Sequence, residues 1–501
     1  MSDTSKPRYF LTPDFHQSTG PVHAVIDPAT LEEVGMRASV TPEEIVSVLT
    51  RVNAAQAGWK KIDAKSRAQI LHRLASRIED NDMTTCAILM SREMGKPYPE
   101  AIGEVANCAS IFRYYAEMAR DDAGKVAGTT QAGSLQYARY EPYGVSAHIM
   151  PFNFPILLMC WTVAASLAAG NGCVIKPAEA TTLSTLEFMK VFDVLPADLV
   201  ACLPGGSDVG VALVDSDKTH AIAFTGSVGA GQAVAASAAR RMKPAVIEAG
   251  GSDPMIITEH APIAIAAAGA VTCAFHMSGQ VCTSTERLYV VDSIHDAFVE
   301  AFVAETRRLR IGNGLDKSEI GPLVSQAALQ KVERLVADAV AKGAKVECGG
   351  KMPQGLDRGW FYEPTILTGC SPDMEIFNSE VFGPVVAIVR VPDFDTAIAK
   401  ANDSPFGLGA SIFTTDLEEA HEAAERLEAG MVWVNNPMID NDALPFGGWK
   451  ASGMGRELGR QGLDAFRRSK MVIMDHKPVR HDWWYPYPDE WFLEAGGRKH
   501  V

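Results

Sequence analysis

Apolar positions in the first quarter of the chain recur with a helical period. In residues 66–78 the apolar side chains return every three or four positions and share one face. Thr41 can cap a helix, a proline follows it, and Glu44 can complete a capping box, so another helix is predicted to begin here. The same period returns over residues 100–118. We therefore predict amphipathic helices in all three places.

The period changes near residue 124. Residues 136–140 alternate between polar and apolar side chains and lead into a Glu-Pro-Tyr-Gly turn, so we interpret residues 125–142 as a hairpin arm. From residue 144 to about 251 short β-rich runs alternate with helical runs, which is typical of βαβ units and a parallel sheet. The alternation resumes from residue 253 to about 455 and indicates a second α/β domain. Strands are predicted over residues 145–150, 172–176, 199–203, 221–225, 244–248, 288–291, 385–391 and 431–435.

Composition narrows the class of protein. A chain of 501 residues is too long for one core, so two or three domains are expected. The formal net charge of −15 argues against nucleic acid or an anionic membrane as a partner. The nine cysteines contain no CxxC pair and the histidines show no metal-ligand spacing, so we expect reduced thiols in the cytoplasm and no metal. Residues 154–170 are the most apolar stretch, which is short for a membrane span and is predicted to be a buried helix.

Three polar side chains beside the predicted strands could carry chemistry. Cys282 ends a Gly-Gln-Val-Cys motif that would present a thiol on a loop, although most single cysteines are small core residues. Glu248 closes an apolar strand before two glycines, where burial would make it a general base; a helix cap or an arginine pair is the alternative. Asn153 precedes the buried helix and could donate to an oxyanion, or cap that helix.

Two further strand ends suit a dinucleotide. Lys176 and Glu179 follow a buried strand, where a carboxylate accepts hydrogen bonds from ribose hydroxyls and a lysine reaches the same sugar. Gly226 and Ser227 lie in a Gly-rich turn between a strand and a helix, which suits a pyrophosphate. The spacing is not G-x-G-x-x-G, so an ordinary strand-to-helix turn is an equal alternative.

The motifs FNFP, KPAE, FTGS, EAGG, GQVC, EVFGP and PFGG occur in this order, and together they resemble the aldehyde dehydrogenase superfamily over about residues 20–475. The resemblance implies NAD(P)-dependent oxidation of an aldehyde to a carboxylic acid through a thioester on Cys282. It implies Glu248 as the base, and Asn153 with the Cys282 backbone N–H as the oxyanion donors. The implied cofactor contacts are Lys176 and Glu179 at the adenine ribose, Gly226 and Ser227 at the dinucleotide turn, and Glu380 and Phe382 at the nicotinamide ribose. Because Glu179 would repel a 2′-phosphate, NAD is favoured over NADP.

The resemblance also implies a domain plan. A Rossmann-like dinucleotide-binding domain would comprise residues 1–124 and 143–250, and an α/β catalytic domain residues 251–455. An oligomerisation arm of residues 125–142 and 456–480 would build homodimers or homotetramers. The aromatic C-terminal tail, residues 481–501, has two prolines and cannot form an ordinary helix. We expect the tail to pack on the body or on a neighbour, where it could cover the entrance to the active site.

The family comparison further implies a substrate tunnel with mostly apolar walls, so we expect an apolar or aromatic aldehyde. Semialdehyde dehydrogenases of the succinate type often have an arginine near Trp161, and its absence counts against a dicarboxylic semialdehyde. Asp440 and Asp442 lie in a solvated loop or, if they face the tunnel mouth, indicate a cationic aminoaldehyde of the betaine-aldehyde type. The implied tunnel residues are Phe154, Leu158, Trp161, Val281, Thr283 and Phe446.

Two rival functions share this scaffold: acyl transfer to coenzyme A, and a catalytically silent binding or structural role. The retained Glu248 favours hydrolysis over acyl transfer, and the intact set of thiol, carboxylate and amide counts against a silent protein. Phe152, Gly229 and Ala249 stand where the family often has Trp, Glu and Leu. None of these departures removes a reacting group, although Gly229 could alter how the pyrophosphate is held.

Overall fold

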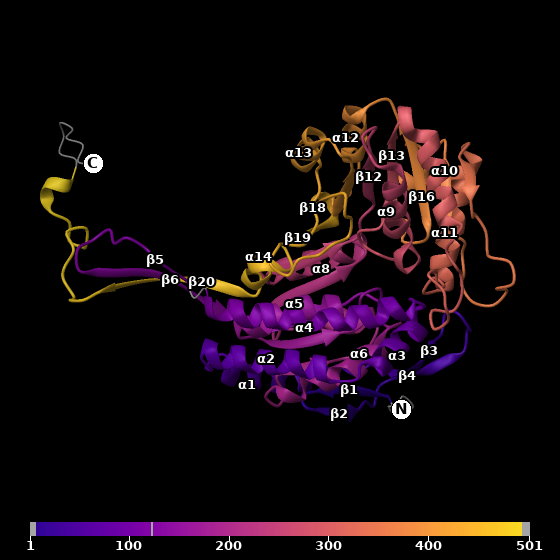
Figure 1. Cartoon of the computed structure of the whole chain (residues 1–501). Helices are drawn as coiled ribbons and strands as arrows, with labels where there is room; N and C mark the ends of the chain where they lie inside the picture. Colours follow the sequence, from indigo (N-terminus) through magenta and orange to yellow (C-terminus); the bar gives the residue numbers. More distant parts are fainter. Residues whose placement is uncertain (1–6, 122–123, 493–501) are drawn as a thin grey trace. The chain divides into compact units, whose positions relative to one another are not determined.

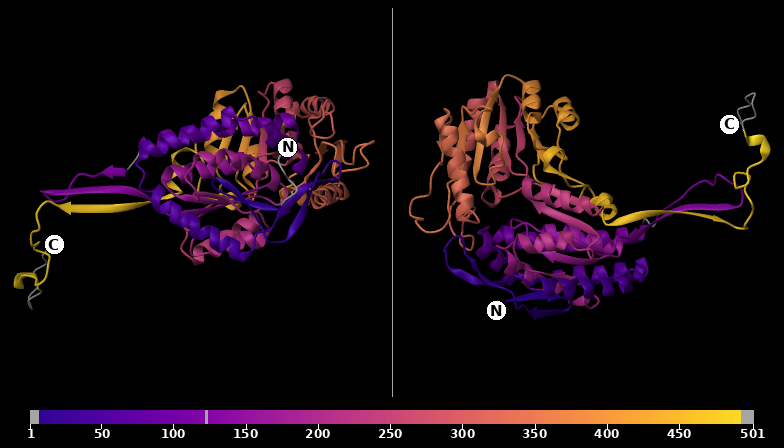
Figure 2. Two further views of the ribbon diagram at one scale, coloured as in Figure 1. Left: turned by 90° about the horizontal axis from the view of Figure 1, so that it is seen from below. Right: turned by 180° about the vertical axis from the view of Figure 1, so that it is seen from behind.

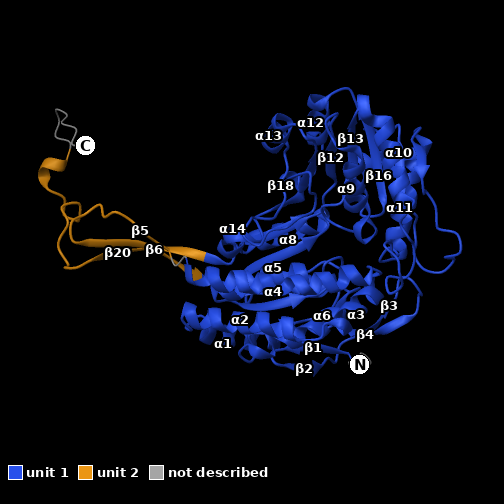
Figure 3. Ribbon diagram, in the orientation of Figure 1, with its two compact units in different colours: residues 1–121, 142–467 blue, residues 122–141, 468–501 orange. Residues whose placement is uncertain are grey.

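The computed structural model of the protein describes residues 7–121 and 124–492. The chain forms two compact units, coloured separately in Figure 3: unit 1 comprises Met1–Asp121 and Pro142–Arg467, and unit 2 comprises Asp122–Glu141 and Arg468–Val501. Unit 1 contains two large, mostly parallel sheets with helices packed against them (Figure 1, Figure 2). The predicted α/β class is therefore confirmed.

The first sheet of unit 1 has eight strands. They are β1 (Arg8–Leu11), β2 (Asp14–Gln17), β7 (Val145–Ile149), β8 (Gly172–Lys176), β9 (Val200–Cys202), β10 (Ala221–Gly226), β11 (Ala245–Ala249) and β19 (Gly453–Met454). Their order is β19-β11-β10-β7-β8-β9-β1-β2, and the run from β11 to β9 is parallel. The strands from β7 to β9 follow one another toward one edge of the sheet, whereas β10 and β11 follow one another toward the opposite edge. The topological switch point therefore lies between β7 and β10, where such sheets bind ligands.

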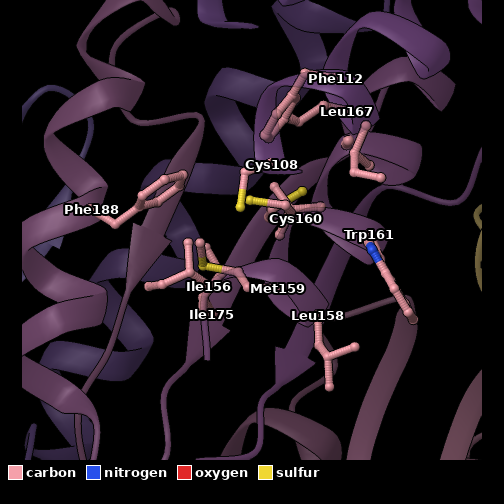
Figure 4. Packing of buried hydrophobic residues seen from close by; sticks show 14 of the residues in the cluster. Cys108, Phe112, Ile156, Leu158, Met159, Cys160, Trp161, Leu167, Ile175 and Phe188 are labelled. Carbon is pink, nitrogen blue, oxygen red and sulfur yellow. The ribbon is translucent and has the colours of Figure 1, made fainter. Parts of the chain in front are cut away.

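Helices cover both faces of this sheet. They are α1 (Pro42–Trp59), α2 (Ala64–Asp80), α3 (Thr84–Met94), α4 (Tyr98–Asp121), α5 (Leu157–Ala169), α6 (Thr182–Phe188), α7 (Ser207–Asp215) and α8 (Val228–Arg240). Alternate residues of β8 enter different clusters: Val174 packs with α1 and α7, whereas Cys173 and Ile175 pack with α2, α4 and α5. Figure 4 shows part of the second cluster, where Cys108 and Cys160 lie between aromatic and aliphatic side chains. A small separate sheet pairs β3 (Val22–Ile26) with β4 (Glu33–Ala38).

Two local predictions about these helices are confirmed. Thr41 caps α1, because its hydroxyl accepts the Glu44 N–H at 3.2 Å while the Glu44 carboxylate accepts the Thr41 N–H at 2.9 Å. The apolar stretch near residue 160 forms α5, which is buried along almost its whole length. No helix in the described part of the chain combines the length and the apolar character that crossing a membrane requires.

The second sheet has seven strands in the order β14-β15-β16-β13-β12-β17-β18, and all neighbours except β14 and β15 are parallel. The strands are β12 (Asp253–Ile257), β13 (Thr285–Val291), β14 (Lys345–Cys348), β15 (Thr365–Thr368), β16 (Val385–Val391), β17 (Gly409–Phe413) and β18 (Met431–Val434). The accompanying helices are α9 (Ile263–Phe275), α10 (His295–Thr306), α11 (Gln326–Ala341), α12 (Phe394–Asn402) and α13 (Leu417–Arg426). The predicted second α/β alternation corresponds to this sheet.

Unit 2 contains a three-stranded sheet, with β6 (Ser134–Pro142) between β5 (Gly124–Val126) and β20 (Arg467–Asp475). The arm predicted over residues 456–480 begins later than expected, because residues 456–467, including α14 (Gly459–Asp464), belong to unit 1. The described part of the aromatic tail, residues 481–492, has exposed rings that contact one another, such as Tyr485 and Tyr487 at 4.7 Å between centroids. Residues 493–501 of that prediction lie outside the described residues.

Candidate active site

Three segments that are distant in sequence meet near the switch point of the first sheet. Asn153 lies in the loop between β7 and α5, and Glu248 is the fourth residue of β11. Cys282 lies between the short 3-10 helix η2 (His276–Gly279) and β13. All three side chains line one cavity of about 310 Å³, which is called the first cavity below. The structure therefore brings the predicted thiol, carboxylate and amide together.

Cys282 is held on a strained and tightly bonded loop. Met277 and Ser278 have left-handed φ angles of 52° and 58°, and Gly279 follows at 71°. A Cβ on Gly279 would collide with a neighbouring main-chain carbonyl, so only glycine fits there. The side chain of Gln280 donates to the Met277 carbonyl at 3.2 Å and accepts a main-chain N–H at 2.9 Å. These bonds hold the thiol-bearing loop in a strained backbone conformation, and such strain is often found at functional sites.

Glu248 is a buried carboxyl without an ion-pair partner. It is 1% exposed, and neither oxygen makes a hydrogen bond of ordinary geometry with a described residue. Burial raises the pKa of Glu248 to about 7, although Cys282 and Thr225 lie close enough to lower it in part. Neither the arginine pair nor the helix cap considered from the sequence occurs among the described residues. A carboxyl that titrates near neutrality is suited to proton transfer.

The thiol of Cys282 faces this carboxyl. Burial and then the charge of Glu248 raise the pKa of Cys282 well above its usual range. The proton therefore rests on the sulfur until a base accepts it, and Glu248 is the base within reach. Cys282 is also partly accessible, unlike six of the nine cysteines, which are buried.

Asn153 is not used as a helix cap. Helix α5 begins at Leu157 after Ile156, and no side chain caps it. Asn153 is only 2% exposed and lines the first cavity beside Cys282. Its amide is therefore placed to donate a hydrogen bond into the cavity.

A second cavity, of about 390 Å³, lies on the other side of Cys282. Trp161 and Phe446 form one wall of it, packed edge to face with centroids 4.9 Å apart. All of the residues expected in the tunnel line this cavity: Phe154, Leu158, Trp161, Val281, Thr283 and Phe446. Because Cys282 lines both cavities, its thiol stands at the junction between them.

The second cavity also contains polar groups that the sequence did not reveal. Glu100 and Glu104 reach it from α4, and His276 reaches it from η2. Glu104 forms a buried ion pair with Lys96. The sequence did contain a signal for these residues. Glu104 stands four positions after Glu100, so both carboxylates lie on the same face of α4, and a carboxylate on the buried side of an amphipathic helix indicates a polar site.

The sequence left open whether Asp440 lies in a solvated loop or faces the tunnel. Asp440 lines the second cavity, so it faces the tunnel. Solvent still reaches its side chain. The surrounding protein, and then the charge of Asp442, raise the pKa of Asp440 to about 6. Asp442 is not among the residues that line the cavity. The carboxyl groups of Glu100 and Asp440 therefore border a cavity whose walls include aromatic and aliphatic side chains.

The residues expected at the dinucleotide turn and at the nicotinamide ribose lie together at the first cavity. Gly226, Ser227, Glu380 and Phe382 all line it. Burial, and then the charge of a neighbouring glutamate, raise the pKa of Glu380 to about 8, and its carboxylate accepts a main-chain N–H at 3.2 Å. Ser227 is the N-cap residue of α8 and its side chain makes no capping hydrogen bond, which leaves main-chain N–H groups of the first turn available to an anion.

Glu286 fixes the loop that carries Glu380 and Phe382, a role that the sequence did not reveal. Its buried carboxylate accepts the N–H groups of Val381 and Phe382 at 2.8 and 2.9 Å. Phe382, with a φ of 52°, then packs edge to face on Phe152 at 5.7 Å between centroids. The position of the loop therefore depends on a residue of β13, far away in sequence.

Lys176 is the last residue of β8 and Glu179 lies three residues after it, and neither is among the residues that line the first cavity. Lys176 is 8% exposed, and burial lowers its pKa. Glu179 pairs with Arg37, whose side chain is 10% exposed, whereas the Glu179 side chain is 52% exposed. Arg37 was not expected from the sequence, since it lies in β4 about 140 residues earlier.

Comparison with known proteins decides the family. The model of the aldehyde dehydrogenase family matches residues 15–472. The chain belongs to the aldehyde dehydrogenase family. A betaine aldehyde dehydrogenase from Bacillus subtilis is 34% identical over 92% of this chain and 96% of its own length, and one from Mesorhizobium japonicum is 36% identical over 90% and 93%.

Solved structures resemble the aldehyde dehydrogenase chain over almost its whole length. A betaine aldehyde dehydrogenase from Staphylococcus aureus in complex with NAD⁺ has a TM-score of 0.92 at 30% identity, covering 96% of this chain and 97% of its own. An NADP-dependent enzyme from E. coli has a TM-score of 0.91 at 33% identity, covering 95% and 99%. The predicted family is confirmed, and with it an oxidoreductase that acts on aldehydes.

Proposed function

We propose that this aldehyde dehydrogenase oxidises a cationic aldehyde to the carboxylic acid through a thiohemiacetal and then a thioester on Cys282. The observation that supports this most directly is the position of the thiol at the junction of the two cavities. One cavity then receives the aldehyde, and the other receives the hydride acceptor.

The acylation step uses three groups of this chain. Glu248 takes the proton of the Cys282 thiol, and the sulfur attacks the carbonyl carbon. The carbonyl oxygen becomes an oxyanion, to which the Asn153 amide and the Cys282 backbone N–H donate hydrogen bonds. When the oxyanion carbon loses a hydride, its C=O bond forms again and a thioester remains.

The enzyme uses NAD(P), which when bound supplies the hydride acceptor. The residues present fit this group: Glu380 offers ribose acceptors, and the uncapped start of α8 at Ser227 offers N–H groups for the pyrophosphate. We assign Lys176 and Glu179 to the adenine ribose. Glu179 disfavours a 2′-phosphate, which makes NAD the preferred form.

Hydrolysis releases the acid. Glu248 first gives the thiol proton to solvent and so becomes a carboxylate again. It then takes a proton from a water molecule, whose oxygen attacks the thioester carbonyl. The carbon–sulfur bond then breaks, and the thiolate regains the proton from Glu248. The buried, unpaired carboxyl of Glu248 can serve both steps because its pKa of about 7 lets it exchange protons near neutrality.

The walls of the second cavity favour a cation at the far end of the substrate. Phe154, Trp161 and Phe446 offer aromatic faces, and such faces attract ammonium groups. Glu100 and Asp440 add carboxyl groups at the same cavity. These carboxyl groups are complementary in charge to an ammonium group, and the relatives from Bacillus subtilis and Mesorhizobium japonicum are betaine aldehyde dehydrogenases.

An apolar or aromatic aldehyde is the second candidate, favoured by the same rings together with Leu158 and Val281. A carboxy-aldehyde fits less well, because Glu100 and Asp440 would repel it. Lys96 reaches this region as the partner of Glu104, so its charge is already neutralised by that ion pair.

We also propose the division of labour among the parts of the chain. The first sheet and its helices bind the dinucleotide, the second sheet carries the thiol, and unit 2 serves homo-oligomerisation in a cytoplasmic enzyme. All nine cysteines are free thiols, which fits a reducing compartment. Light scattering on the purified protein, with and without the arm residues, would test the assembly.

The test of the reaction is an aldehyde panel. Purified protein is incubated with NAD or NADP and with aliphatic, aromatic, amino- and carboxy-aldehydes, and NADH absorbance and acid are measured. We expect one acid for each NADH, the highest kcat/KM for an amino-aldehyde, and no reaction with Cys282→Ala. Absence of NADH across the panel would overturn the reaction. If acyl-CoA forms when coenzyme A is added, the second step is acyl transfer and not hydrolysis. A preference for carboxy-aldehydes would overturn the proposed substrate class.

A further inference from the structure

Two polar residues form a pair on the wall of the second cavity. His276 begins η2, six residues before the nucleophile, and Glu100 lies in the first turn of α4. The Nδ1 atom of His276 is 3.3 Å from Oε1 of Glu100, and the same oxygen accepts the Met277 N–H at 3.4 Å. Both side chains line the cavity next to Cys282. The other oxygen of Glu100 is buried and has no partner among the described residues.

The pair leaves one ring nitrogen free. Burial, and then the charge of Lys96, lower the pKa of His276 to about 4, so the ring is neutral at neutral pH. Above its pKa of about 7, a value raised by burial, Glu100 is ionised and can only accept a hydrogen bond. Nδ1 therefore carries the ring hydrogen and donates to Glu100. Nε2 is left as an acceptor, and it has no hydrogen-bond partner within residues 7–121 and 124–492.

We propose that His276, oriented by Glu100, is a specificity-determining residue that accepts a hydrogen bond from an N–H group of the aldehyde substrate. The subsite selects a primary or secondary ammonium over a quaternary ammonium, which has no hydrogen to donate. This inference rests on the proposed oxidation of a cationic aldehyde and narrows its substrate class. It also separates this chain from an enzyme that would recognise its substrate by aromatic faces and charge alone, since those attract both kinds of ammonium equally.

Three aldehydes of equal chain length test the inference: propanal, the three-carbon ω-aminoaldehyde, and the N-trimethyl derivative of that aminoaldehyde. Assays at about pH 8 keep Glu100 ionised, because its pKa is about 7. We expect the wild-type enzyme to prefer the primary amine. In His276→Phe, kcat/KM for the primary amine should fall by about 10- to 100-fold, mainly through KM, as is typical when a buried hydrogen bond to a charged group is lost. Activity with propanal and with the trimethyl compound should change little.

His276→Gln is the matched control, because its amide oxygen can still accept a hydrogen bond. It should retain part of the preference for the primary amine that His276→Phe loses. Equal losses on all three aldehydes in both variants, or an unchanged preference in His276→Phe, would overturn the assignment. Failure of the wild-type enzyme to oxidise any of the three would instead contradict the proposed function, so the two failures are distinguishable.

Discussion

Lys96 and Glu104 form an ion pair in which neither side chain has any exposed surface. The Glu104 carboxylate also accepts the N–H groups of Ile156 and Leu157 at 2.8 and 3.1 Å. The ammonium of Lys96 lies 4.5 Å from the ring centroid of Phe154. The pair therefore joins α4 to the loop between β7 and α5, the loop that carries the oxyanion donor.

Breaking this pair should destabilise the protein. We expect Lys96→Met to lower the free energy of unfolding by about 3–5 kcal/mol, because it leaves the Glu104 charge buried and uncompensated. Urea denaturation followed by circular dichroism measures the change. Lys190→Met is the matched control, since it breaks the more exposed pair with Glu187 and should cost less than about 1 kcal/mol. Similar losses in the two variants would contradict the role of burial.

The pH dependence of catalysis should report Glu248 when propanal is the substrate, because propanal has no ammonium group for Glu100 or His276 to bind. The base acts in its ionised form, so kcat/KM should rise with pH and level off above about 7, the pKa to which burial raises this carboxyl. Ionisation of Cys282 by itself would place the rise at a higher pH, because its pKa lies well above the usual range. Glu248→Gln should lose most activity and the inflection near neutrality. An inflection that persists in this variant would assign the base to another group.

Removing the side-chain oxyanion donor should slow the chemistry without disturbing the cofactor. We expect Asn153→Ala to lower kcat by about 100- to 1,000-fold, the usual effect of losing one such donor. Because α5 has no side-chain cap, the substitution should leave the melting temperature almost unchanged. Stopped-flow measurement of the NADH burst, together with a melting curve, tests both parts. A large drop in melting temperature with a small change in rate would indicate a structural role.

Cofactor choice should depend on Glu179. In Glu179→Gln the ratio of kcat/KM for NADP to that for NAD should rise at least about fivefold, because a like charge near 4 Å contributes on the order of 1–4 kcal/mol of repulsion. Arg37→Met should shift the ratio in the opposite direction, since it removes the cation that neutralises Glu179. Unchanged ratios in both variants would place the adenine ribose elsewhere.

The charge of Asp440 should matter only to cationic aldehydes. We expect Asp440→Asn to lower kcat/KM for an amino-aldehyde by up to about fivefold, the scale of a solvent-accessible ion pair. Propanal should react as before. Asp442→Asn is the control, because Asp442 does not line the second cavity. If both substitutions lower kcat/KM for the amino-aldehyde equally, the carboxylates act through long-range electrostatic attraction and Asp440 does not contact the substrate.

Most of the helices and strands could be predicted from local sequence patterns. The capping box at Thr41 and the strand over residues 385–391 are recognisable because their signals lie within a few neighbouring residues. The C-terminal segment of unit 2 begins at residue 468, later than the start at residue 456 that the family resemblance implied for the arm, because α14 packs against α5. The hydrophobic periodicity of a segment does not show whether that segment packs against a helix that is distant in sequence.

The amino-acid sequence by itself determined the alternating architecture and the motifs that bear the thiol, the carboxylate and the amide. Tertiary structure alone decided that Cys282 stands between two cavities, that Glu248 is unpaired, and that His276 meets Glu100. The physical reason is that burial and pairing depend on groups more than a hundred residues apart in the chain. A carboxyl or an imidazole acquires its protonation state only when those groups have excluded the solvent around it.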